Sequence, residues 1–222
     1  RFPSGLNLTA YTDHLTRPSI NGRSLAHLPP PARARAGLGR TFQQTELFDS
    51  LTVAQNVALG AEAGYAGWNP IDHMVTTPSQ RTRTRTATQA AIALCGLGDL
   101  ADASVSTLTT GQRRVVELAR CLAGDYEVIL LDEPSSGLDQ VETQRFGAIL
   151  TEVAGHGTTI LLVEHDMALV NRICDHVFVI DFGKPIFDGT VAQVAASPIV
   201  RHAYLGDEEL IVDIGMSEEE LS

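Results

Sequence analysis

The chain has 222 residues, 44% of them hydrophobic, and a formal net charge of −11 at pH 7. This length allows one domain with a sizeable core, and the acidic balance argues against a nucleic-acid-binding protein, which normally presents a basic patch. The cysteines Cys95, Cys121 and Cys174 lack metal-binding spacing, so free thiols in a reducing compartment are expected. No run is long enough for a transmembrane helix, and no signal peptide is visible.

The first half of the chain shows few regular patterns. Residues 29–37 predict a break followed by a short helix that a glycine ends. A strand is expected at residues 39–42, with Gln43 at its end. Two helices are expected at residues 53–59 and 87–97, with a loop-rich insertion at residues 60–78 between them.

From Gly111 onward, helices and strands are expected to alternate regularly. The expected helices are residues 112–123, 141–154 and 167–174, and the expected strands are residues 128–131, 158–163, 176–181 and 185–187. This alternation predicts an α/β fold built on a parallel sheet. Residues 207–222 are expected to form an acidic tail.

Two adjacent carboxylates, Asp132 and Glu133, follow the apolar run 128–131 directly. Such a run predicts a strand buried on both faces of a parallel sheet, and ligands of open α/β sheets bind just past the carboxyl ends of the strands. Neighbouring carboxylates repel each other and a cation relieves this repulsion, so Mg²⁺ with a polyphosphate is the expected ligand. The alternative is that Asp132 caps a helix and Glu133 is solvated.

Five motifs in chain order carry a resemblance to a known family. They are Phe42-Gln43, Thr109 to Gln112, Ile129 to Glu133, Gly137 to Asp139, and His165. Together they resemble the Q-loop, signature loop, Walker B strand, D-loop and switch histidine of the ATP-binding domain of an ABC transporter. The resemblance implies a P-loop NTPase-like α/β core with a parallel sheet and flanking helices, residues 1–43 and 109–206, and a small helical subdomain, residues 44–108, within one domain.

The resemblance also implies site residues for ATP and Mg²⁺. Asp132 and Gln43 would bind Mg²⁺, Glu133 would activate the attacking water as general base, and His165 would contact the γ-phosphate. The signature loop (Thr109, Thr110, Gly111 and Gln112) would bind the ATP of an opposing subunit through a helix N-terminus, and Asp139 would belong to the same nucleotide site. Simple helix capping by Thr109 is compatible with this role. Thr109 and Thr110 depart from the usual Ser and Gly.

The phosphate-binding Walker A loop of the family does not occur in this sequence. In the nearest stretch, residues 3–9, Leu8 stands at the position of the lysine that would reach the phosphates. The strand expected next to the Walker B strand is missing too, which predicts apolar surface and unpaired backbone groups along a sheet edge. Two explanations remain open. The chain is a fragment or frameshifted copy of an active ATPase, or it is a degenerate subunit that offers its signature loop to a partner's ATP.

Four segments resemble one group of ABC proteins, the ATP-binding subunits of branched-chain amino-acid uptake systems. They are residues 37–48, 51–57, 181–184 and 203–206. This resemblance implies an importer ATPase, peripheral on the cytoplasmic face of the membrane. Its partners would be a second ATP-binding subunit, two membrane permeases and a solute-binding protein. The rival functions are a non-transport ABC ATPase, against which the acidic charge counts, and a non-enzymatic interaction module.

Overall fold

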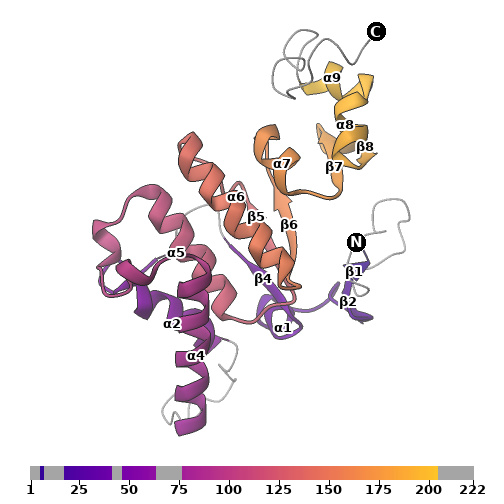
Figure 1. Ribbon diagram of the computed structural model, residues 1–222. Helices are drawn as coiled ribbons and strands as arrows, with labels where there is room; N and C mark the ends of the chain where they lie inside the picture. Colours follow the sequence, from indigo (N-terminus) through magenta and orange to yellow (C-terminus); the bar gives the residue numbers. More distant parts are fainter. Residues whose placement is uncertain (1–5, 8–17, 42–46, 64–76, 205–222) are drawn as a thin grey trace. The chain divides into compact units, whose positions relative to one another are not determined.

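The structure is a computed structural model that describes residues 6–7, 18–41, 47–63 and 77–204 (Figure 1). Leu8 and Gln43 lie outside the described residues, as does the acidic tail expected at residues 207–222. The chain divides into two compact units, with the boundary between Glu164 and His165. The expected division into an α/β core and a helical subdomain stays a prediction.

The N-terminal unit contains both short strands and long helices. Its strands are β1 (Leu6–Asn7), β2 (Ser19–Ile20), β3 (Arg23–Ser24), β4 (Leu38–Arg40), β5 (Val128–Asp132) and β6 (Thr159–Val163). Its α-helices are α1 (Pro30–Arg35), α2 (Val53–Ala63), α4 (Pro78–Leu94), α5 (Thr110–Ala123) and α6 (Gln140–Gly155), and two 3₁₀ turns span Gly98–Leu100 and Val105–Thr107. The first three strands form a small antiparallel sheet of their own.

A parallel sheet in the order β4-β5-β6 forms the centre of this unit. The middle strand, β5, buries Val128, Ile129 and Leu131, which confirms the expected burial of the apolar run. Such burial on both faces is typical of central parallel strands, because helices cover the sheet. Figure 1 shows α6 running beside this sheet, and α6 contacts β6.

The expectation that the strand ending in Asp132 lacks a neighbour was wrong. β5 is hydrogen-bonded to β4 on one side and to β6 on the other, so the outer strands of this sheet among the described residues are β4 and β6. At the end of the outer strand β6 the apolar side chain of Val163 is 57% exposed. The order of strands in a sheet is set by helical crossovers rather than by chain order. For this reason the sequence did not predict correctly which strands lie on the outside of the sheet.

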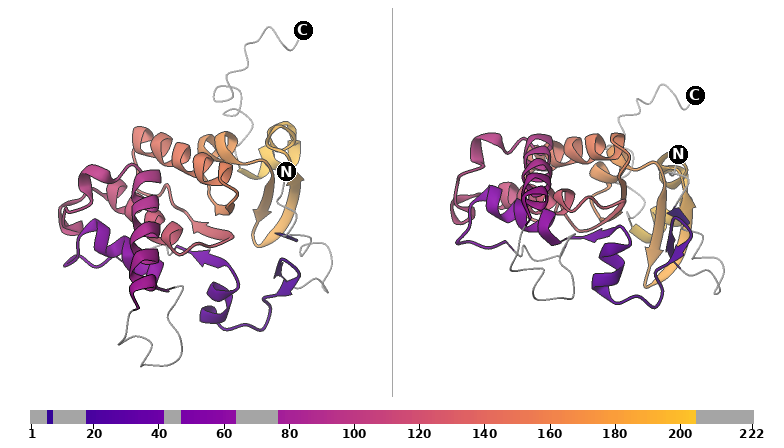
Figure 2. Two further views of the ribbon diagram at one scale, coloured as in Figure 1. Left: turned by 60° about the horizontal axis from the view of Figure 1, so that its bottom comes forward. Right: turned by 90° about the horizontal axis from the view of Figure 1, so that it is seen from below.

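Helices α2, α4 and α5 pack against one another (Figures 1 and 2). Helix α4 begins nine residues before the expected start at residue 87. Thr77 and Gln80 form a reciprocal capping box at its N-terminus, and Pro78 occupies the first turn, where its missing N–H costs nothing. The early turns of α4 are exposed and lack apolar periodicity, so hydrophobic patterning could not reveal them.

The C-terminal unit contains a β-hairpin and three short helices. These are α7 (Met167–Ile173), β7 (Val177–Asp181), β8 (Lys184–Gly189), α8 (Val191–Ala196) and α9 (Pro198–Tyr204). β7 and β8 pair antiparallel through a turn in which Phe182 and Gly183 both have positive φ, 44° and 77°, as tight hairpins require. A small core of Val179, Val194 and Val200 holds the hairpin and helices together. The sequence interpretation had assigned no helix to residues 190–204.

No helix in the described parts of the chain is both long enough and apolar enough to cross a membrane. Cys95 and Cys121, which fall within apolar helical patterns, are buried free thiols as predicted, and Cys174 is a half-buried free thiol. Burial raises the pKa of Cys95 and of Cys121 to about 12, and burial also raises the pKa of Cys174. Thiols with such high pKa values are poor nucleophiles at neutral pH.

Candidate functional site

Asp132 and Glu133 lie at the carboxyl end of β5. Ligands of open α/β sheets bind just past the carboxyl ends of the parallel strands. The Asp132 side chain is partly exposed, at 27%. Glu133 has φ +45°, in the left-handed region that non-glycine residues seldom adopt, and its N–H donates to the Val163 carbonyl at 2.9 Å. Strained backbone of this kind persists where surrounding structure enforces it, and it clusters at functional sites.

Arg40 faces Asp132 from the end of the neighbouring strand. Its Nη2 lies 3.5 Å from Asp132 Oδ2. Arg40 is opposite Leu130 in the β4–β5 register, and successive side chains alternate between faces, so Arg40 and Asp132 lie on the same face of the sheet. Sequence reasoning missed this residue, although its place three positions before Gln43 was an available signal.

Glu164, at the end of β6, holds the loop that carries Glu133. Its carboxylate accepts a hydrogen bond from the Ser135 N–H at 2.8 Å. Within the loop, the Ser136 N–H donates to the Glu133 carbonyl at 3.1 Å, and Gly137 provides a positive φ of 80°. The sequence interpretation gave Glu164 no role, because its contact with Ser135 joins positions 29 residues apart.

The signature-loop segment begins helix α5. The Thr109 hydroxyl accepts a hydrogen bond from the Gln112 N–H at 3.2 Å, and the Gln112 side chain accepts one from the Thr109 N–H at 3.0 Å. This reciprocal capping box confirms the capping interpretation. Thr110 occupies the first turn, and Gly111 is buried next to a side chain from another helix.

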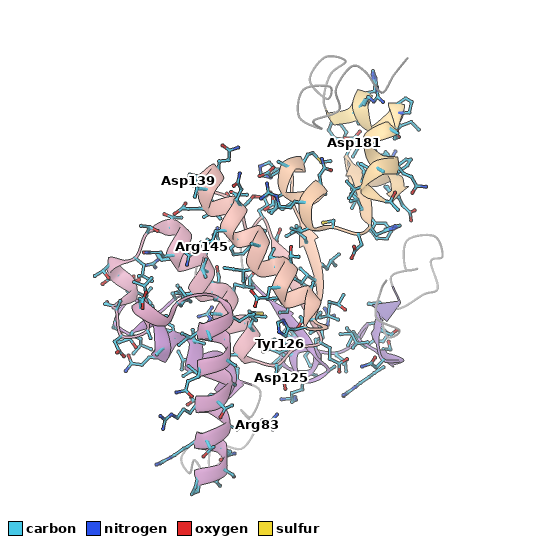
Figure 3. The ribbon with its side chains drawn as sticks, viewed as in Figure 1. Arg83, Asp125, Tyr126, Asp139, Arg145 and Asp181 are labelled. Atoms are coloured by element: carbon cyan, nitrogen blue, oxygen red, sulfur yellow. The ribbon has the colours of Figure 1, made fainter. Side chains whose placement is uncertain are left out.

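The side chain next to Gly111 is that of Glu142 in α6, which brings the signature loop and Asp139 together. A Cβ at Gly111 would lie 2.3 Å from a Glu142 carboxylate oxygen. Glu142 also forms a capping box with Asp139, whose carboxylate accepts from the Glu142 N–H at 2.8 Å. Further along α6, Arg145 donates to the Gly96 carbonyl at 3.3 Å (Figure 3). The N-termini of α5 and α6 are therefore held side by side.

Two further predicted site residues are His165 and Gln43. His165 is exposed and begins the C-terminal unit, and Asp166 after it caps α7. Gln43 lies outside the described residues.

A cleft of about 1050 Å³ lies at the opposite end of the sheet. Its lining includes Arg83 of α4 and the segment Asp125, Tyr126 and Glu127, which directly precedes β5 (Figure 3). A large pocket is the usual first choice for a ligand site. We favour the carboxyl end of β5 instead, because the cleft contains none of the predicted site residues.

The residues at the carboxyl end of β5 fit a magnesium–nucleotide complex. Among the described residues, no group of three or more His, Cys, Asp or Glu side chains could hold a metal ion. Mg²⁺ does not need such a group, because it usually binds through one or two carboxylates while phosphate oxygens and water complete its shell. Asp132 is accessible and already faces a cation, Arg40, so its carboxylate suits this role.

Comparisons with known proteins agree with this geometry. The family model described as ABC transporter matches residues 8–136. The chain is 37% identical over 192 residues to the high-affinity branched-chain amino acid transport ATP-binding protein BraF of Pseudomonas aeruginosa, covering 85% of this chain and 75% of that protein. It is equally similar, over the same shares, to LivG of Escherichia coli K12. The methionine import ATP-binding protein MetN of Pasteurella multocida is 36% identical over 81% of this chain but only 49% of its own length.

Solved structures share the fold. An ATP-binding cassette of an ABC transporter in its ADP conformation matches with a TM-score of 0.69 at 24% identity, over 85% of this chain and 76% of that one. CbiO1 from Clostridium perfringens, part of an ABC transporter complex, matches with a TM-score of 0.68 at 27% identity, over 84% and 70%. The expected α/β ABC ATPase fold is confirmed. With a family model that covers more than half of its length and relatives at 37% identity, the chain belongs to the ABC transporter family of ATP-binding, ATP-hydrolysing subunits.

Proposed function

We propose that the chain is the ATP-binding subunit of an importer for branched-chain amino acids. The observation that carries this proposal is the 37% identity over 192 residues with BraF and LivG, whose names give that substrate. The match to MetN reaches 36% identity but covers only 49% of that protein, so it supports the broader importer class more than methionine as substrate.

At the carboxyl end of β5, Asp132 and Gln43 would bind Mg²⁺, and Glu133 would act as general base toward the attacking water. Phosphoryl transfer depends mainly on positioning and charge stabilisation, so a fixed loop matters more than a shifted pKa. The hydrogen bond from the Ser135 N–H to Glu164 supplies such fixing. His165 would contact the γ-phosphate.

The signature loop, Thr109 to Gln112, and Asp139 would act together on the ATP of an opposing subunit. Their support is the contact between the N-termini of α5 and α6 through Gly111 and Glu142. Backbone N–H groups at a helix N-terminus attract phosphate. This role does not need the missing lysine, so it holds for a degenerate subunit as well as for an active one.

The partners in this proposal are a second ATP-binding subunit, two membrane permeases and a solute-binding protein. The chain would sit peripherally on the cytoplasmic face of the membrane. ABC ATP-binding subunits of importers work with membrane permeases, and the membership of the family supports this assembly.

The test is Glu133→Gln in the reconstituted transporter, compared with Glu62→Gln, which changes an exposed carboxylate on α2. General-base catalysis contributes about 10²- to 10⁴-fold, so we expect hydrolysis to fall by about that factor with ATP binding retained. Uptake of labelled leucine, with methionine as competitor, tests the substrate. Unchanged hydrolysis would place catalysis in the partner subunit and favour the degenerate-subunit alternative.

A further inference from the structure

The nucleotide site of this chain poses a charge problem. ATP brings several negative charges to the carboxyl end of β5, which already carries the carboxylates of Asp132 and Glu133. In addition, the sequence has Leu8 where the family's phosphate-binding lysine would stand. One Mg²⁺ offsets only two of these charges. A second cation from the protein would lower the electrostatic cost of binding the phosphates.

Arg40 is placed to be that cation. It ends β4 on the same sheet face as Asp132, and its Nη2 lies 3.5 Å from Asp132 Oδ2. The Arg40 side chain is 57% exposed, so solvent and ligands can reach the guanidinium. A guanidinium carries five N–H donors in a planar fork that matches phosphate oxygens well.

We propose that Arg40 is a phosphate-binding residue of this chain and contacts the β- or γ-phosphate of Mg-ATP bound at Asp132. In the nucleotide-free protein Arg40 pairs with the Asp132 carboxylate. When Mg²⁺ binds that carboxylate, the arginine would exchange this partner for a phosphate oxygen. This inference rests on the proposed nucleotide site, to which it adds a residue.

A purely structural role for the pair is the weaker explanation. An exposed ion pair at 3.5 Å contributes little to stability, typically about 0–1 kcal/mol. Leu38 and Gly39, rather than Arg40, are the half-buried and buried residues of β4, so the strand does not need Arg40 for packing. Replacing the arginine should therefore leave the fold intact, and the urea unfolding midpoint of the variant checks this.

The experiment is calorimetric titration of the full chain with Mg-ATP and with AMP, for the parent protein, Arg40→Gln and Arg40→Lys. Arg85→Gln, at an exposed position on α4, is the matched control. One charge-assisted hydrogen bond to a phosphate raises the binding affinity by about tenfold. We expect Arg40→Gln to weaken Mg-ATP binding by about this factor, Arg40→Lys to weaken it less, and Arg85→Gln to have no effect.

AMP lacks the β- and γ-phosphates, so its affinity should be the same for the parent chain and for Arg40→Gln. Equal Mg-ATP affinity of Arg40→Gln and the parent would overturn the inference while leaving the nucleotide site standing. An equal loss of AMP and Mg-ATP affinity would also overturn it, since the effect would not involve the outer phosphates. No Mg-ATP binding by the parent chain up to millimolar concentration would remove the chain's own nucleotide site, and this inference with it.

Discussion

Helices α2 and α5 approach each other closely at Gly60 of α2. A Cβ built on Gly60 would lie 1.8 Å from the Arg120 carbonyl oxygen and 2.8 Å from the Arg120 carbonyl carbon. Real Cβ atoms do not come this close to other atoms. Because the neighbour is backbone, the contact can be relieved only by moving one helix away from the other.

The expected cost of Gly60→Ala is the difference between two opposing effects. Alanine in a helix interior is favoured over glycine by about 1 kcal/mol. Overpacking costs typically about 1–3 kcal/mol, and we take the upper end because the obstacle is a carbonyl rather than a flexible side chain. The net loss of stability is then about 2 kcal/mol, equivalent to a fall in Tm of about 4–8 °C for a chain of this size.

Urea unfolding followed by circular dichroism measures this difference, with Gly155→Ala as control. Gly155 ends helix α6, and a Cβ there would meet nothing within 4 Å. The control should be neutral or more stable by up to about 1 kcal/mol. If Gly60→Ala unfolds at the same urea concentration as Gly155→Ala, the close approach of α2 to α5 is not as described and the reasoning fails.

Three further predictions concern the cap, the loop and the thiols. Thr109→Ala should cost about 1 kcal/mol through loss of the α5 cap, whereas Thr109→Ser, which keeps the hydroxyl, should cost far less; equal unfolding midpoints would contradict the cap. Glu164→Ala removes the acceptor of the Ser135 N–H, so hydrolysis by the reconstituted transporter should fall while Mg-ATP affinity stays constant; a matching loss of affinity would show a wider disturbance. Cys95 and Cys121 have pKa values raised from 9.0 to about 12 by burial, so above pH 9 the unfolded chain releases thiol protons that the native protein keeps. Each thiol should then lower the free energy of unfolding by about 1.4 kcal/mol per pH unit up to about pH 12, and a Cys95→Ala/Cys121→Ala variant that keeps the full slope would refute this.

Local patterns in the sequence were enough to predict many elements. The apolar run before Asp132 became β5, the Thr109 cap began α5, and the expected strand at residues 158–163 became β6. These features depend on interactions over one to four residues, such as capping boxes and turn residues, or on burial that favours an unbroken apolar run. Helix α4 was expected too short because its exposed first turns carry no apolar pattern. Helix α8 was missed although Thr190 and Gln193 form the same capping box that Thr109 and Gln112 form.

By itself, the sequence determined the family, the order of the motifs, and the place of Asp132 and Glu133 at the end of a buried strand. Only the tertiary structure decided which strands flank β5, that Arg40 faces Asp132, and that Glu142 joins the signature loop to Asp139. The physical reason is distance along the chain. Arg40 and Asp132 are 92 positions apart. Contacts of that kind arise from sheet order and helix packing, which no local pattern of residues encodes.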